Sequence, residues 1–244
     1  MTSREVTSFL PLAERRPRKS ASDIGWLALF ALLNGPWLLK SLSGGSKHAK
    51  AVLLERLDLP GDALPNLGSW KADTGFLTLI ADHIEAHRPR NVVELGAGAS
   101  SLIIGRALQK YGQGHLLSLD QHEDFIRATS EWLREHGVDA DLRHAPLGNP
   151  EHDWPGFWYE TGPLPDAIDL LVIDGPPWTI HPFVRGSAEA LFGRIPVGGV
   201  VLLDDAARPG ERLIARRWRK RWPNFQFRLV HVGTKGTLIG TRIG

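Results

Sequence analysis

From residue 91 onward, short apolar runs alternate with longer segments whose apolar residues recur every three or four positions. Short apolar runs indicate buried strands, and the longer spacing indicates helices packed by one face. The alternation predicts an α/β domain whose mainly parallel sheet is covered by helices on both faces. The expected strands are 91–95, 115–119, 139–144, 168–173, 199–203, 225–231 and 237–242. The expected helices are 100–111, 123–136, 184–192 and 211–222.

The last two expected strands, 225–231 and 237–242, are joined by a tight turn at 233–236. A parallel crossover needs a much longer connection than this turn. One strand of the pair is therefore predicted to run antiparallel to its neighbours.

The first 68 residues follow another pattern, which predicts a basic tail and an apolar helical extension ahead of a main domain over 69–244. Residues 24–39 are almost entirely apolar, and Asn34-Gly35-Pro36 interrupts them. The run is shorter than the ~20 residues that a spanning helix needs. A linker is expected at 43–48, and helices over 49–59 and 74–87.

Three interpretations of the apolar run remain open. It forms a helix packed on the domain, a peripheral membrane contact through residues 15–40, or a homodimer contact. The basic cluster Arg15-Arg16-Pro17-Arg18-Lys19 directly precedes it, as in membrane-anchoring segments. Packing and interfacial attachment are favoured over spanning.

Composition excludes some classes of site. The 244-residue chain has no cysteine, which excludes a disulfide framework, a thiolate metal site and a cysteine nucleophile. It also fits a reducing compartment, so a cytoplasmic location, with membrane association through the extension as an option, is expected. The formal net charge is only +2. The basic residues between 212 and 221 are interpreted as a solvated segment, and a nucleic-acid partner is not expected.

The segment Glu94-Leu95-Gly96-Ala97-Gly98-Ala99-Ser100-Ser101 follows an expected strand and opens a helix. Two glycines allow a sharp turn and close approach to a ligand, as in dinucleotide sites. However, Ser101 stands where a dinucleotide loop has its third glycine, and the Glu94 carboxylate would repel a pyrophosphate. S-adenosylmethionine carries no phosphate and has a sulfonium and an ammonium group, so an acid suits it. Asp120 ends the next strand, where a carboxylate accepts hydrogen bonds from ribose hydroxyls.

These motifs, with Asp174-Gly-Pro-Pro and Asp204-Asp205-Ala206 later in the chain, are similar to those of class I methyltransferases over residues 70–244. The resemblance implies a Rossmann-like fold with a seven-stranded sheet, one strand near the C-terminus antiparallel, and S-adenosylmethionine as cofactor. It also implies that Glu94, Gly96, Gly98 and Ser101 surround the methionine part and that Asp120 holds the ribose. His144 and Ala145 would flank the adenine. Ala97, Ser100, Gln121 and Asp174 are expected in the same cofactor site.

Three carboxylates follow the fourth and fifth parallel strands. Asp174 ends one strand, and Asp204 and Asp205 end the next. The carboxyl ends of parallel strands share one edge, so these groups are expected to converge and to need a compensating cation. The arrangement resembles metal-dependent O-methyltransferases, in which such residues bind Mg²⁺ and the metal lowers the pKa of the acceptor hydroxyl. The alternative is that Asp174 contacts cofactor or acceptor without a metal, while Asp204 and Asp205 cap a loop.

The turn Asp174-Gly175-Pro176-Pro177-Trp178 is also partly similar to the [DN]-P-P-[YFW] turn of amino-methyltransferases, although Gly175 shifts the acid by one residue. His181 follows the turn and is a candidate general base beside Asp174.

The leading hypothesis is O-methylation of a small-molecule or glycan hydroxyl, assisted by Mg²⁺. One alternative is an N-methyltransferase acting on nucleic acid or protein. Another is an NAD-dependent dehydrogenase or a non-catalytic nucleotide-binding module. The identity of the acceptor is left open.

Overall fold

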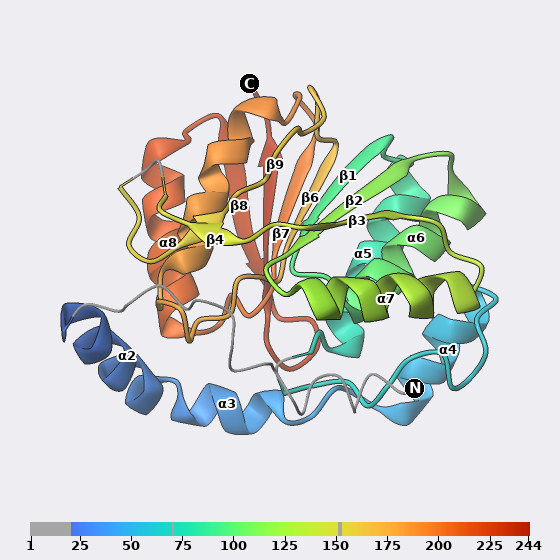
Figure 1. Ribbon diagram of the computed structural model, residues 1–244, viewed down its shortest axis with the longest axis horizontal. Coiled ribbons are helices and arrows are strands. Elements are labelled where there is room, and N and C mark those ends of the chain that lie inside the picture. Colours follow the sequence, from blue (N-terminus) through green and yellow to red (C-terminus); the bar gives the residue numbers. More distant parts are fainter. Residues whose placement is uncertain (1–20, 70, 151–152) are drawn as a thin grey trace.

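A computed structural model describes residues 21–69, 71–150 and 153–244 and is built around one seven-stranded sheet (Figure 1). Six strands are mutually parallel, and β9 is antiparallel to both of its neighbours, β7 and β8. The predicted fold class, including the antiparallel strand near the C-terminus, is confirmed. In spatial order the strands are β3 (Asp141–His144), β2 (His115–Asp120), β1 (Asn91–Leu95), β6 (Leu170–Ile173), β7 (Val200–Leu203), β9 (Thr237–Arg242) and β8 (Phe225–Val230).

Helices cover both faces of the sheet. One core contains the buried sides of α4 (Lys47–Arg56), α5 (Thr74–His87) and α6 (Ala99–Tyr111), and α7 (Glu123–Glu135) adds Leu133 to it. The opposite core contains the 3₁₀ helix η1 (Val184–Arg194) and α8 (Pro209–Arg221). Successive residues of β1 alternate between the two, with Val92 in the first core and Val93 in the second.

The apolar run of the extension forms two helices, α2 (Ala21–Leu33) and α3 (Gly35–Ser41). The break falls at Asn34-Gly35-Pro36, because Pro36 starts a new helix and cannot continue the previous one. Phe30 is buried on the inner side of α2, with its ring centroid 5.2 Å from that of Phe183. The helices α2, α3 and α4 follow one another along one edge of the molecule (Figure 1).

Within the described ranges, no single helix is long and apolar enough to span a membrane. Helices α2 and α3 reach that length and hydropathy only together, and they are bent by 57° at their junction. The basic cluster at 15–19 lies outside the described residues. Leu53 and Leu54 of α4 are buried in the same core as α5 and α6, so this part of the extension packs as part of the sheet domain. The domain boundary at residue 68 stays a prediction.

Two details differ from the sequence-based expectation. Residues 43–48 were expected to be a linker, but the Ser46 hydroxyl accepts a hydrogen bond from Ala49 N and caps α4, which begins at Lys47. A small antiparallel pair, β4 (Leu147–Gly148) with β5 (Trp158–Tyr159), lies in the long loop after β3. Strands of two residues are too short to produce a period of two, so the pattern of apolar residues does not reveal them.

Candidate functional site

The glycine-rich loop connects β1 to α6 and depends on close backbone packing. Gly96 has φ +97°, a conformation that favours glycine. A Cβ atom at Gly96 would lie 2.6 Å from the backbone nitrogen of Gly175, and Gly175 in turn packs on Gly96 and on the hydroxyl of Tyr159. The glycine that separates Asp174 from the two prolines is therefore required by the contact between the two loops.

Glu94 lies behind this loop and not in the cavity wall. Its Oε2 atom accepts hydrogen bonds from the hydroxyls of Ser101 and Ser118, each at 2.5 Å. The Ser101 hydroxyl also accepts a hydrogen bond from Gly98 N at 2.9 Å. Glu94 and Ser101 were expected beside the cofactor, but both are fully buried. Their hydrogen bonds stabilise the conformation of the glycine-rich loop.

Burial raises the pKa of Glu94 from 4.5 to about 7, although the hydrogen bonds from the serine hydroxyls oppose this shift. The folded state therefore keeps a proton that the unfolded chain has lost, and folding stability attributable to Glu94 falls as the pH rises from 4.5 to about 7. A shift of this size corresponds to about 3 kcal/mol.

We expect Glu94→Gln, which keeps the accepting oxygen, to remove this dependence. The free energy of unfolding of wild type and variant, measured by urea denaturation between pH 4.5 and 8, should diverge as the pH rises, with the variant the more stable at the upper end. Parallel curves would contradict the assignment.

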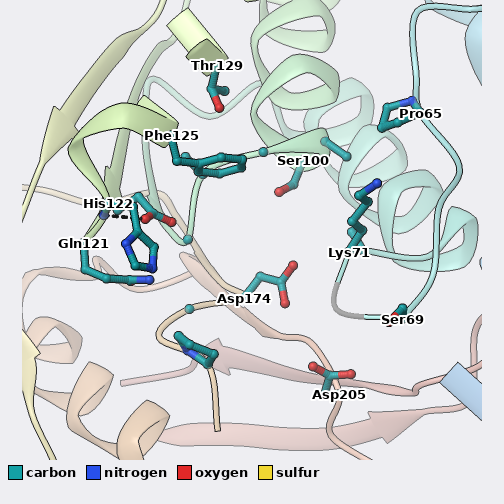
Figure 2. A pocket seen from close by; sticks show the side chains of 18 of the residues that line it. Pro65, Ser69, Lys71, Ser100, Gln121, His122, Phe125, Thr129, Asp174 and Asp205 are labelled. Carbon is teal, nitrogen blue, oxygen red and sulfur yellow. Dashed lines mark hydrogen bonds between the residues drawn. The ribbon is translucent and has the colours of Figure 1, made fainter. Parts of the chain in front are cut away.

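The principal cavity among the described residues opens at the carboxyl edge of the sheet and has a volume of about 730 Å³. Its walls come from the glycine loop, the end of β2, one side of α7, the loop after β6 and the segment that follows α3. Figure 2 shows the Asp174 carboxylate projecting into this space between Ser100 and Asp205. The last residue of α3 and the segment after it contribute Ser41, Leu42, Pro65, Ser69, Lys71 and Ala72.

Most of the predicted cofactor residues line this cavity. They are Gly96, Ala97, Gly98, Ser100, Asp120, Gln121 and Asp174. The Oδ1 atom of Asp120 also accepts a hydrogen bond from His122 N, which fixes the turn after β2.

His144 and Ala145 were expected beside the adenine but are absent from the cavity wall. The Nε2 atom of His144 lies 3.1 Å from the carbonyl oxygen of Gln121, and Ala145 N donates to the carbonyl of Asp120. Both residues support the end of β2 from the side of β3.

His181 does not reach the cavity either. Its side chain is 1% exposed, and its Nδ1 atom accepts a hydrogen bond from Phe183 N at 3.1 Å. Its Nε2 atom lies 3.9 Å from Asp23 of α2. His181 therefore belongs to the packing between α2 and the domain, and this position excludes it as a general base for a substrate in the cavity.

The three predicted carboxylates do converge. One oxygen each of Asp174, Asp204 and Asp205 lie within 4.8 Å of one another. Asp205 has φ 59°, an uncommon conformation for a residue with a side chain. We refer to these three residues as the carboxylate cluster.

Side-chain cations surround the carboxylate cluster. Arg185 of η1 places Nη2 3.2 Å from Asp174 and Nη1 3.0 Å from Asp205. Arg208 Nη2 lies 2.7 Å from Asp205. Asp205, Arg185 and Arg208 are almost fully buried, so the ion pairs of Asp205 are weakly screened.

Lys235 supplies a third positive charge from the turn between β8 and β9. Its ammonium lies 3.6 Å from Asp204 and 3.5 Å from Asp205, and it donates a hydrogen bond to the carbonyl oxygen of Lys71 at 2.7 Å. The Lys235 side chain is 1% exposed. This contact ties the turn between β8 and β9 to the cavity wall.

Burial and the neighbouring charges shift the pKa values of Asp204 and Asp205 in opposite directions. Burial tends to raise the pKa of Asp205, but Arg208, Lys235 and Arg185 together lower it to about 2. Burial and the adjacent charge of Asp205 raise the pKa of Asp204 well above its ordinary value. Neither oxygen of Asp204 has a hydrogen-bond partner in the described part of the chain.

A divalent cation fits this arrangement poorly. Oxygen ligands suit Mg²⁺, but they must lie about 2.1 Å from the metal. The ammonium of Lys235 and the guanidinium of Arg185 already contact the oxygens that would be ligands, and they supply the charge that the predicted metal was invoked to supply. The convergence of Asp174, Asp204 and Asp205 is thus as predicted, but side chains provide the compensating charge.

Sequence reasoning missed the residues that complete this site. Arg185 lies in a helix with no motif, and Lys235 lies in a β-turn about 30 residues after the acids that it approaches. The only signal in the sequence was the expected convergence of three carboxylates, which requires positive charge from elsewhere in the protein or from a metal.

Comparison with known proteins agrees with this geometry. Residues 93–206 match a family model described as a methyltransferase domain. The O-methyltransferase TomG of Streptomyces achromogenes, involved in tomaymycin synthesis and solved with S-adenosylmethionine, is 17% identical with a TM-score of 0.54, over 92% of this chain and 100% of that one. Methyltransferase PaMTH1 of Podospora anserina, solved with S-adenosylhomocysteine, is 13% identical with a TM-score of 0.55, over 96% and 100% of the chains.

An O-methyltransferase of Bacillus cereus, also in complex with S-adenosylhomocysteine, is 13% identical with a TM-score of 0.53, over 90% of this chain and 99% of that one. Comparison with curated proteins returns no match for the sequence. At these identities the structural similarity establishes the fold, and the family model adds the class of domain.

Proposed function

We propose that this chain is a class I S-adenosylmethionine-dependent methyltransferase, as the methyltransferase-domain match over residues 93–206 and the fold indicate, and that it methylates a hydroxyl oxygen of a small-molecule or glycan acceptor. The observation that carries the proposal is the position of Asp174. Its carboxylate projects into the cavity next to the glycine loop, and its side chain is 12% exposed. Proteins of the same fold include O-methyltransferases, which favours oxygen as the acceptor atom.

The cavity suits S-adenosylmethionine. The loop from Gly96 to Ser100 presents backbone with little side-chain bulk, and Asp120 is placed at the end of β2 where a ribose is held in this fold. Bound S-adenosylmethionine supplies a methyl group on a positively charged sulfur that leaves as a neutral thioether. The chain's own task is to hold the acceptor in line and to remove its proton.

Asp174 is the group suited to take that proton. Burial raises the pKa of its carboxyl, while the guanidinium of Arg185 opposes the shift and keeps the ionised form accessible. As the acceptor oxygen forms its bond to the methyl carbon and the carbon–sulfur bond breaks, the hydroxyl proton passes to Asp174. Arg185 holds the carboxylate in place through its Nη2 atom.

We further propose that the reaction needs no divalent metal, because Arg185, Arg208 and Lys235 already balance the carboxylate cluster. Assistance by Mg²⁺, as the sequence resemblance implied, is the competing version. It differs by requiring that these side chains give up their contacts with Asp174 and Asp205.

The test uses purified protein with methyl-labelled S-adenosylmethionine and acceptor panels of phenols, sugars and amines, each with EDTA or with Mg²⁺. We expect label on hydroxyl compounds and equal rates in EDTA and Mg²⁺. Label on amines alone would replace the proposal by N-methylation, which the Asp174-Gly-Pro-Pro-Trp178 turn would then explain. Loss of activity in EDTA, restored by Mg²⁺, would overturn the metal-free version.

A further inference from the structure

Helix α2 exposes an apolar face that its packing does not explain. Its large exposed side chains are Ile24, Trp26, Leu29, Leu32 and Leu33, of which Leu32 is 79% exposed. Asp23 is the only charged residue of the helix, and it faces inward toward His181. A surface helix of a globular protein normally carries polar or charged residues on its outer side.

The inner side of α2 is already occupied. Phe30 packs against Phe183, and the ring of Trp26 lies 5.6 Å from that of Phe183. The helix is thus attached to the domain by one side, and its outer side is left without a partner among the described residues. Contiguous exposed apolar area of this kind marks a surface for protein or lipid.

Exposed apolar side chains also occur in α3 and at the residue that follows it, next to the cavity. Leu39 is 72% exposed and Leu42 is 64% exposed. Leu42 and Ser41 also line the cavity that contains Asp174. We call the exposed apolar residues Ile24, Leu29, Leu32, Leu33, Leu39 and Leu42 the apolar face.

Positive charge lies at both ends of this segment in the sequence. Among residues 1–20, five are basic and two are acidic, and four of the basic ones stand at Arg15, Arg16, Arg18 and Lys19. At the other end, Lys40 and Lys47 are exposed. Apolar residues flanked by basic ones suit a bilayer surface that contains anionic lipid.

We propose that the apolar face binds in the surface of an anionic lipid bilayer and that the acceptor is an amphiphile whose apolar part enters the cavity past Leu42. The second half rests on the proposed function, whereas the first does not. The bend of 57° between α2 and α3 and the anchoring of Phe30 favour a segment that lies in the interface over one that crosses it. A second copy of the chain is the less suitable occupant, because it would bring the same basic flanks together.

Vesicle sedimentation of the full chain tests the docking. We expect binding to vesicles of phosphatidylcholine with phosphatidylglycerol, weaker binding at high salt, and little binding to phosphatidylcholine alone. The double variant Leu32→Glu with Leu39→Glu should bind about tenfold less, since two charges enter the apolar face. Val197→Glu with Leu213→Glu, which changes two exposed apolar residues elsewhere, is the matched control and should bind as the wild type does.

Unchanged S-adenosylhomocysteine binding in both double variants shows that they fold. Equal binding of the two double variants to vesicles, or no binding by the wild type, overturns the docking. A wild-type dimer in lipid-free solution that Leu32→Glu with Leu39→Glu converts to a monomer would assign the face to a second copy.

The acceptor is tested separately with labelled S-adenosylmethionine and extracted bacterial lipids presented as vesicles. Label in the organic phase, reduced in the Leu32→Glu and Leu39→Glu variant, supports an amphiphilic acceptor. Label on water-soluble hydroxyl compounds alone would overturn this acceptor class while leaving the proposed function intact. Vesicle binding with label on amines only would overturn the proposed O-methylation while leaving the docking to a bilayer intact.

Discussion

Replacing Asp174 with Asn is expected to lower kcat by about 10²- to 10⁴-fold, the range associated with loss of a general base. The amide keeps the size of the carboxyl and can still accept a hydrogen bond from Arg185, but it cannot take the acceptor proton. Because Asp174 must be ionised to act and its pKa is raised, the wild-type rate should also increase with pH on the acidic side. Steady-state rates with the best acceptor from the panel measure both effects.

Binding of S-adenosylhomocysteine, measured by calorimetry, is the control for this variant and should change only a few-fold. Asp174→Glu keeps the charge but moves it, so its kcat should lie between those of the wild type and Asp174→Asn. A wild-type kcat in Asp174→Asn would exclude Asp174 as the base. A large loss of cofactor affinity with an unchanged kcat would instead assign Asp174 to cofactor binding alone.

Replacing Lys235 with Ala is expected to destabilise the protein by about 3–5 kcal/mol, the usual cost of leaving a buried charge without its partner. The ammonium is the nearest positive charge to Asp204, and its removal leaves two adjacent buried carboxylates with less compensation. The free energy of unfolding from urea denaturation gives the size of the effect. Lys220→Ala, at an exposed lysine of α8, is the matched control and should stay within about 0.5 kcal/mol.

The same variant tests whether side chains take the place of a metal. Mn²⁺ binding followed by electron paramagnetic resonance should be absent in the wild type and present in Lys235→Ala, because the vacated space lies between oxygens of Asp204 and Asp205. Mn²⁺ should then recover part of the lost stability. Tight stoichiometric Mn²⁺ binding by the wild type would show that the sequence resemblance to metal-dependent enzymes was right in this respect.

The centre of the sheet was predictable because β6 and β7 are buried on both sides and read as continuous apolar runs. The glycine loop marks the end of a third strand. The β4–β5 pair was not predictable, since its pairing joins residues ten or more apart through two-residue strands. Its Tyr159 matters to the site, because the hydroxyl packs on Gly175 and donates to Gln121.

The site was predictable where motifs fix backbone geometry and not where it depends on packing. Gly96, Asp120 and Asp174 line the cavity as expected because strand ends place them there. Glu94 had the right position in the chain, but whether its carboxylate faces the ligand or the interior depends on Ser101 and Ser118, whose hydroxyls bind it. His181 satisfied the chemical criterion for a base, yet the docking of α2 against Phe183 buries it.

Lys235 is also the last of the site's residues to leave the ribosome. Until the turn between β8 and β9 has been synthesised and folded back, Asp204 and Asp205 lack one of their cations and Lys71 lacks the hydrogen bond that fixes its carbonyl. A nascent chain that has already formed its first five parallel strands would therefore carry an open and electrostatically strained site. Cofactor binding should accordingly appear only after the turn between β8 and β9 has been synthesised and has folded back.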